Sequence, residues 1–276
     1  MTDAPSSLIQ FQQRFPDEAA CAAYLTAVRW PHGFNCPRCG HTKAWPLRIK
    51  AWTYECAGCH KQTSVTAGTV LHGSKLPLTL WFWAAYLMAT HSNGISARQL
   101  QHQLALGSYK TAWLLCAKLR ASMVAGAVIK AKSSSSVRSK CKTAGPVPAV
   151  SASKRCPITR LPACIPSWLP ISPPATAKTD GWSGYPGVHH DPHTVGKMAA
   201  HIVLPWTHRV FSNLKTWALG VYHGLRRKHL QSYLDEFVFR FNRRHHRHAS
   251  FRSLLGIAAG HAPLTYKMLV SPEATV

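Results

Sequence analysis

The stretch that decides the fold holds two cysteine motifs, C-P-R-C at residues 36–39 and C-A-G-C at residues 56–59. Sixteen residues separate them, a spacing typical of zinc sites built from two C-x₂-C pairs. We therefore predict a zinc ribbon over residues 35–70. Gly40 and Gly58 would allow tight turns beside the sulfurs. The predicted ligands of one tetrahedrally held Zn²⁺ are Cys36, Cys39, Cys56 and Cys59. Two redox motifs or unrelated buried thiols are the alternative, which the paired spacing disfavours.

The composition indicates a polyanionic partner. The 276 residues include 33 Lys plus Arg against 9 Asp plus Glu, a formal charge of +24, which favours nucleic acid. A membrane surface is the competing partner, but the strongest apolar run, Leu78–Thr90, is too short to span a bilayer. The N-terminus has no signal-peptide pattern, and the cysteine usage fits a reducing compartment. We expect a cytoplasmic protein with no membrane contact.

Helices are predicted on both sides of the ribbon. In the N-terminal helical segment, residues 1–34, a helix is expected over Asp17–Arg29, between two prolines. Strands are expected within the ribbon at Lys43–Arg48 and Ala51–Glu55. Residues 76–123 then have helical patterning, with helices predicted over Leu78–Thr90, Ser96–Leu104 and Ser108–Ser122.

The second and third of these helices resemble a helix-turn-helix. Ser96 and Ser108 stand where N-caps are needed, and a short turn containing Gly107 joins the helices. The third helix would then enter the major groove of DNA. Its candidate DNA-binding residues are Tyr109, Lys110, Thr111 and Lys118. The alternative is a helical hairpin that only packs on a core.

Two regions follow with opposite character. Residues 124–178 contain eight prolines and no acid, and they show neither strand nor helix periodicity. Beyond them, helices are predicted over Thr207–Leu219 and Lys228–Arg244, the latter with an apolar stripe suited to core packing. A basic run follows, in which Arg243, Arg244 and Arg247 are candidate phosphate contacts or a solvated face.

Several short stretches follow one another along the chain in a specific order. They are F-P-D-E from Phe15, R-W-P-H-G-F-N-C-P-R-C-G from Arg29, G-I-S-A-R-Q-L-Q from Gly94, Y-K-T-A-W from Tyr109, T-D-G-W-S-G-Y from Thr179, H-R-V-F-S-N-L-K-T-W from His208, Y-H-G from Tyr222, K-H-L from Lys228, Y-L-D-E-F-V-F-R-F-N-R-R from Tyr233 and H-A-P-L-T-Y from His261. Taken in this order, they are similar to bacterial insertion-sequence transposases of the ISXO type, which carry a zinc ribbon. The resemblance covers about residues 8–123 and 176–270.

The resemblance implies an α/β fold with a ribonuclease-H-like core of the DDE type, here incomplete, over residues 179–276 with C-terminal helices. Such enzymes use acidic side chains to hold two catalytic Mg²⁺ or Mn²⁺ ions at a DNA phosphate. The implied partners are the terminal inverted repeats of the insertion sequence and its target DNA. A bacterial, nucleoid-associated protein is implied, and a homo-oligomer is compatible with the family.

The resemblance also indicates candidate catalytic residues. Asp180 would be the second carboxylate, and the third position would be His208 or Asn213, with Lys215 beside it. His208 and Lys215 share one face of a regular helix, whereas Asn213 lies well round from both. The choice between His208 and Asn213 stays open at this point.

The first catalytic aspartate of the family has no counterpart. Its D-E-T-Y-like motif would fall within residues 124–178, which hold no Asp or Glu. We infer compensating frameshifts that left this segment aberrant and poorly ordered, and a transposase copy defective in strand cleavage. The alternatives are a non-enzymatic zinc-ribbon and helix-turn-helix DNA-binding protein, or a basic RNA-binding protein.

Overall fold

The computed structural model describes residues 4–123, 177–179, 190–192 and 205–270, except residue 224. The chain divides into two compact units. Unit 1 combines the residues up to 125 with those from 243 onward, and unit 2 spans residues 126–242. Apart from residues 177 and 178, the predicted aberrant segment 124–178 lies outside the described residues. The frameshift therefore stays a prediction.

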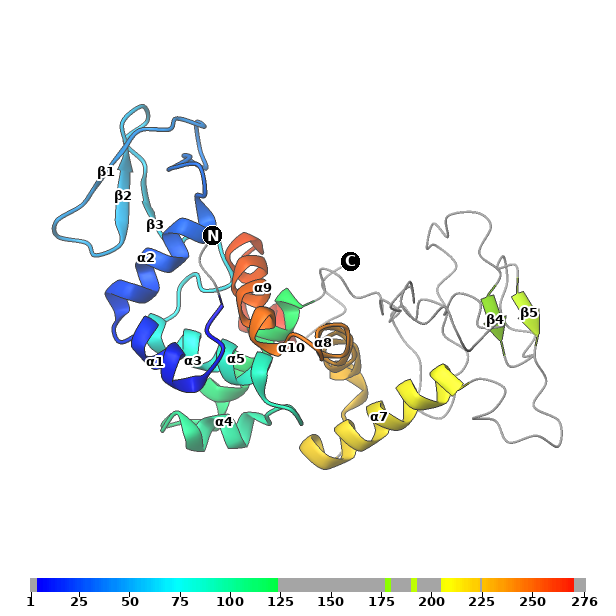
Figure 1. Cartoon of the computed structure of the whole chain (residues 1–276). Coiled ribbons are helices and arrows are strands. Elements are labelled where there is room, and N and C mark those ends of the chain that lie inside the picture. Colours follow the sequence, from blue (N-terminus) through cyan, green and yellow to red (C-terminus); the bar gives the residue numbers. More distant parts are fainter. Residues whose placement is uncertain (1–3, 124–176, 180–189, 193–204, 224, 271–276) are drawn as a thin grey trace. The chain divides into compact units, whose positions relative to one another are not determined.

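Unit 1 consists of a small sheet and seven helices within the described residues (Figure 1). The sheet is an antiparallel meander in the order β1-β2-β3. The elements of unit 1 are α1 (Leu8–Arg14), α2 (Glu18–Arg29), β1 (Ala44–Pro46), β2 (Thr53–Cys56), β3 (Gln62–Ser64), α3 (Leu78–Thr90), α4 (Ala97–Gln103), α5 (Tyr109–Ser122), α9 (Arg247–Gly260) and α10 (Tyr266–Val270).

The predicted helix starts are confirmed by their capping contacts. The Asp17 side chain accepts a hydrogen bond from the Ala20 amide at 2.8 Å and so starts α2. Ser96 and Ser108 cap α4 and α5 in the same way, at 3.2 Å. Each cap satisfies an amide that the helix itself leaves without a partner. The sequence analysis did not predict α1, β3, α9 or α10.

Helix α9 lies in the middle of the core of unit 1. Figure 1 shows it against α2 and α3. Its Phe251 ring is fully buried, with centroids 5.5 Å from Phe11, 5.8 Å from Phe15 and 6.1 Å from Phe82. The Val70 amide, at the end of the predicted ribbon segment, donates to the Ala258 carbonyl of α9 at 3.4 Å. Residues from the C-terminal end of the chain thus complete the core around which the N-terminal helices pack.

One arginine joins the zinc ribbon to α2. The Arg29 guanidinium, at the end of α2, donates to the carbonyls of Ser64, Val65 and Ala67 at 3.1, 2.7 and 2.5 Å. Burial lowers the pKa of Arg29 from its usual value. Because these carbonyls lie at the end of β3 and just after it, the arginine fixes the end of the sheet to the helix that precedes the ribbon.

Unit 2 has a helical pair as its described core. The helix α7 (Pro205–Tyr222) packs on α8 (Leu230–Asn242) through Trp217, Phe237 and Val238. A short 3₁₀ turn, η2 (Arg227–His229), comes just before α8. Two short strands, β4 (Ala177–Thr179) and β5 (His190–Pro192), pair in parallel. The predicted apolar stripe on α8 is confirmed in this packing. The chain is thus a helix-rich α/β protein, and the ribonuclease-H-like core stays a prediction.

Candidate metal centre and nucleic-acid interface

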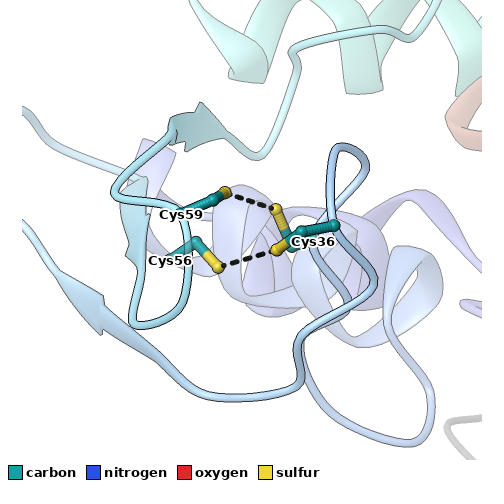
Figure 2. A group of neighbouring side chains, drawn as sticks. Cys36, Cys56 and Cys59 are labelled. Carbon is teal, nitrogen blue, oxygen red and sulfur yellow. Dashed lines mark hydrogen bonds between the residues drawn. The ribbon is translucent and has the colours of Figure 1, made fainter.

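The four predicted ligand sulfurs lie close together; Figure 2 shows Cys36, Cys56 and Cys59 turned toward one another. All four Sγ atoms lie within 4.8 Å of one another. The sulfurs of Cys36 and Cys59 are 3.6 Å apart, and those of Cys39 and Cys56 are 3.5 Å apart. Four thiolates about 2.3 Å from a tetrahedral zinc ion would lie about 3.8 Å from each other. The cysteine geometry therefore fits a structural Zn²⁺.

The two cysteine motifs form matching backbone turns. In each turn, the first cysteine makes two backbone hydrogen bonds. Its carbonyl accepts from the amide of the residue four positions later, and its amide donates to the carbonyl of the residue five positions later. The donor and acceptor pairs are Gly40 to Cys36 at 2.9 Å, Cys36 to His41 at 3.0 Å, His60 to Cys56 at 3.0 Å and Cys56 to Lys61 at 3.1 Å. This repeat places the two sulfur pairs face to face.

The expectation that glycines allow the tight turns is confirmed at Gly40 and wrong at Gly58. Gly40 has a left-handed φ of 72°, but its counterpart in the second turn is His60, with a φ of 52°. Gly58 is needed for space instead. A Cβ at Gly58 would lie 3.3 Å from the His41 ring, which is closer than ordinary van der Waals contact.

Backbone amides and neighbouring sulfurs set the charge of the cluster. The amides of Arg38 and Cys39 lower the pKa of Cys36 to about 6. The His41 amide lowers the pKa of Cys39, but the nearby sulfurs of Cys59, Cys56 and Cys36 together with burial raise it to about 12. One thiol thus ionises readily and the next does not, because thiolate charges repel in a small volume. A divalent cation removes that penalty, so metal binding and thiol ionisation are coupled.

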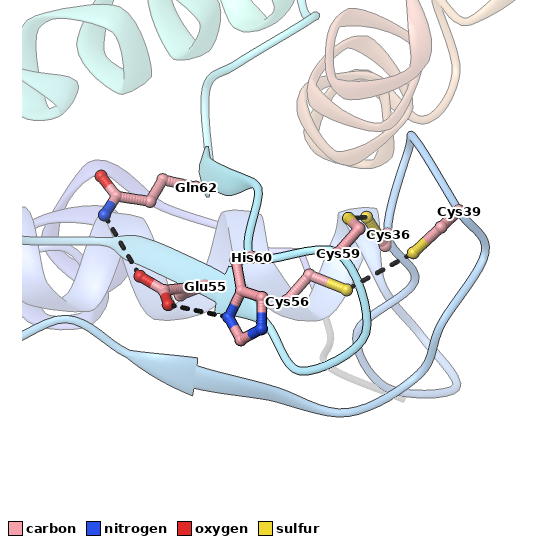
Figure 3. Close-up of polar contacts among 7 residues, drawn as sticks. All are labelled: Cys36, Cys39, Glu55, Cys56, Cys59, His60 and Gln62. Carbon is pink, nitrogen blue, oxygen red and sulfur yellow. Dashed lines mark hydrogen bonds and ion pairs between the residues drawn. The ribbon is translucent and has the colours of Figure 1, made fainter.

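A set of polar contacts supports the second turn from outside (Figure 3). Glu55 lies 3.5 Å from the His60 imidazole and accepts a hydrogen bond from the Gln62 amide group at 3.2 Å. The Lys50 ammonium donates to Gln62 at 2.9 Å. These contacts link the β1–β2 connection and the second cysteine turn to β3.

The helix-turn-helix-like pair is formed by α4 and α5. The left-handed residue in its turn is Ala105, with a φ of 48°, two positions before Gly107. Tyr109 and Lys110 lie exposed on the first turn of α5, and Thr111 beside them is half-buried. These three candidate DNA-binding residues therefore share the N-terminal end of one helix, as the sequence analysis expected.

Lys118 lies elsewhere on α5. It is buried, with its ammonium 5.8 Å from the ring centroid of Trp81, and burial lowers its pKa. It stands about two and a half helical turns beyond Tyr109 and therefore on the opposite side of the helix. The sequence analysis selected it by residue type, without regard to its helix face. In the structure Lys118 packs against α3.

A residue that the sequence analysis missed positions Lys110. The Lys110 ammonium lies 4.8 Å above the ring centroid of Tyr266, in α10, and that ring lies 6.3 Å from Trp113. A cation over an aromatic face is attracted by the ring quadrupole. The only sequence signal for this contact was the H-A-P-L-T-Y stretch, in which Tyr266 is the last residue.

The basic run also belongs to unit 1. Arg247 is exposed at the first turn of α9, whereas Arg243 and Arg244 are half-buried. Burial lowers the pKa of Arg243. The candidate phosphate contacts and the helix-turn-helix-like pair thus lie in the same compact unit.

The candidate catalytic residues are only partly described. His208, Asn213 and Lys215 are all exposed on α7, which is continuous α-helix from Pro205. His208 and Lys215 therefore share a face, as expected for a regular helix. Asp180 lies outside the described residues. Of the groups that could hold a metal ion, the described residues bring together the four cysteines alone.

The acids of α8 are buried. Glu236 is fully buried and accepts hydrogen bonds from the Tyr222 hydroxyl at 3.1 and 3.3 Å. Asp235 is also buried, which raises its pKa to about 6 although Gln231 donates to it at 3.0 Å. Glu236 thus links α8 to the end of α7, whereas Asp235 is a carboxyl group buried at a cost.

The fold and the four-thiolate centre define a zinc-ribbon protein with a helix-turn-helix-like pair. Two family models match it: the transposase zinc-ribbon domain over residues 16–62 and the ISXO2-like transposase domain over residues 170–242. Together the two matches support a transposase of the IS1595 family. Neither the curated proteins nor the solved structures contain a match to the chain. Within the described ranges, no helix has the length and apolarity needed to cross a bilayer.

Proposed function

We propose that this chain is an insertion-sequence transposase that retains DNA binding and has lost strand cleavage. The observation that carries the proposal is the order of the two family matches, which lie on either side of an interval without acids. Between Ala57 and Thr179 the chain contains no Asp or Glu, although the first catalytic aspartate of the DDE type belongs there.

DNA binding is assigned to unit 1. Tyr109 and Lys110 are exposed at the start of α5, and Arg247 is exposed in the same unit. With a formal charge of +24, phosphate contacts would supply most of the affinity. Lys118 is left out of this surface because it is buried against Trp81.

The proposed loss of cleavage rests on where the nine acidic residues of the chain lie. Asp17 caps α2, and Glu18 accepts a hydrogen bond from the Leu78 amide at 2.7 Å. Glu55 supports the ribbon, while Asp235 and Glu236 are buried in α8. The acids that remain are Asp3, Asp180, Asp191 and Glu273. Of these, Asp180 alone lies in a matching motif of the family.

One carboxylate is a poor site for two metal ions. Two divalent cations a few ångströms apart repel each other and need bridging carboxylate charge. His208 and Asn213 carry no negative charge, and Lys215 adds a positive one. The donor set thus does not fit a pair of Mg²⁺ or Mn²⁺ ions, and we derive no cleavage step from it.

An excision assay with Mg²⁺ or Mn²⁺ tests the proposal. We expect no cleavage from the chain as it stands, and we expect its affinity for DNA to be unchanged in Asp180→Ala. Robust cleavage that Asp180→Ala abolishes would mean that a second acid completes the site. Reading the codons for residues 124–178 in the other two frames provides an independent test, because a D-E-T-Y-like motif there would identify the frameshift.

A second candidate function is DNA binding alone. It is favoured by α9 and α10, which follow unit 2 in the sequence but belong to unit 1. There α9 contributes Phe251 to the core, and α10 contributes Tyr266 to the contact with Lys110. For such a protein, replacing residues 126–242 by a short linker would leave DNA affinity and site preference unchanged. A transposase would lose its preference for paired transposon ends. Tighter binding to RNA than to duplex DNA would contradict both functions.

A further inference from the structure

The connection between β1 and β2 forms an exposed hairpin tip, residues 48–52, in the zinc ribbon. Three of the eight large apolar side chains exposed in the described residues belong to this hairpin: Trp45 at 59%, Ile49 at 98% and Trp52 at 38%. Single exposed apolar residues are ordinary, but three within one short hairpin indicate an interaction surface.

The tip is held in a defined shape. The Leu47 amide donates to the Thr53 carbonyl at 2.9 Å and closes the hairpin. Trp52 has a left-handed φ of 56°, and its carbonyl accepts a hydrogen bond from the Val65 amide at 2.9 Å. A bulky residue in this conformation costs of order 1–3 kcal/mol and persists only where neighbouring contacts enforce it. The tip is therefore presented by the ribbon in a fixed conformation.

The charge around the tip is positive. Ile49 lies between Arg48 and Lys50, both exposed. From residue 41 to residue 62 the chain carries four Lys or Arg and one acid, Glu55, which already contacts Gln62 and His60. An apolar side chain between two cations matches the minor groove, where apolar wedges enter between base pairs while cations contact the phosphates.

Other occupants fit this tip less well. A stable protein dimer buries about 800 Å² on each partner, far more than one isoleucine and its neighbours can offer. Stable attachment to a membrane needs a larger apolar face than a five-residue tip provides. A narrow groove lined by phosphates requires only one inserted side chain.

We propose that the hairpin tip is a second DNA-contacting element, in which Ile49 enters the minor groove as an apolar wedge between Arg48 and Lys50. This inference rests on the proposed DNA binding by unit 1. The inserted Ile49 side chain would bend the DNA. The free energy of this contact would depend on how easily the neighbouring base pairs unstack. The ribbon thereby acts on DNA shape as well as stabilising the fold.

The test uses the full zinc-loaded chain and a random-sequence duplex of about 30 base pairs with a fluorophore at each end. Ile49→Ala is expected to reduce the bend reported by energy transfer and to weaken binding by about tenfold. Ile9→Ala is the matched control, because Ile9 is 66% exposed on α1 in the same unit. Arg48→Gln should reduce the slope of log affinity against log salt by about 0.9.

An unchanged bend and affinity in Ile49→Ala would overturn the wedge while leaving the proposed function standing. A variant that instead loses binding to anionic vesicles, or loses self-association, would assign the tip to a membrane or to a second copy. Failure of the unmodified chain to bind duplex DNA would overturn the proposed function together with this inference. Zinc content, measured in each variant, shows that the ribbon is folded.

Discussion

Gly40 and His60 occupy the same position in the two cysteine turns, and both have a left-handed backbone, with φ values of 72° and 52°. Glycine adopts this conformation freely, whereas histidine does so at a cost. We expect His60→Gly to stabilise the ribbon by about 0.5–1 kcal/mol and Gly40→Ala to destabilise it by about 1 kcal/mol. Thermal unfolding of the zinc-loaded protein measures both. Equal effects of the same sign would contradict the strain argument.

Zinc stoichiometry tests the metal centre directly. One equivalent is expected per chain, and it should be lost in Cys36→Ser combined with Cys56→Ser, because each turn then offers a single thiolate. Cys21→Ala is the control. Cys21 is buried in α2, and burial together with the nearby Asp17 and Glu18 raises its pKa to about 12, so it stays a neutral thiol. Loss of zinc in the control, or retention in the double variant, would disprove the ligand set.

In the core of unit 1, Phe251 of α9 packs on aromatic rings from the N-terminal helices, so we expect the stability of those helices to depend on α9. Phe251→Ala should destabilise unit 1 by about 3–5 kcal/mol, because it leaves a cavity among Phe11, Phe15 and Phe82. Gly256→Ala, on the same helix and with open space around its Cβ, should stabilise it by about 0.5–1 kcal/mol. Hydrogen exchange of α3 and α5 reports the effect. Unchanged protection of these helices in Phe251→Ala would show that α9 is dispensable.

Two lysines of α5 are expected to behave differently towards DNA. Lys110→Gln should reduce the slope of log affinity against log salt by about 0.9, because one phosphate contact is lost. Lys118→Met should leave the slope unchanged, because the side chain is buried beside Trp81. Filter binding over a range of salt concentrations measures both slopes. The opposite result would mean that α5 presents its other face to DNA.

The buried Asp235 predicts a pH dependence of unit 2. Burial raises its pKa from 3.8 to about 6, so the folded state binds the proton more tightly than the unfolded state does. The buried Asp235 carboxylate therefore destabilises unit 2 fully above about pH 6, and this destabilisation disappears as the pH falls below about 3.8. Asp235→Asn should stabilise unit 2 by at most about 3 kcal/mol at pH 7, because each unit of pKa difference between the folded and unfolded states corresponds to about 1.4 kcal/mol. Denaturant unfolding at pH 7 and pH 4 checks this; an equal gain at both would refute it.

The sequence predicted those features that depend on local chemistry. Ser96 and Ser108 mark helix starts because a hydroxyl can satisfy a free amide, and the cysteine spacing specifies the metal centre. Features that depend on tertiary contact were missed. Arg243 to His248 concealed the start of α9, since a basic run is typical of a surface and the helix lacks an acidic N-cap. Whether Lys118 faces DNA or the core depends on how α5 packs on α3.

The burial of Phe251 has a consequence for how the protein is made. Ribosomal synthesis delivers α2, α3 and α5 long before α9, which packs against all three in the core of unit 1. Until residues 247–260 emerge, Phe11 and Phe82 have their N-terminal ring partners but lack Phe251. A product of early termination therefore lacks the helix that completes the core of unit 1.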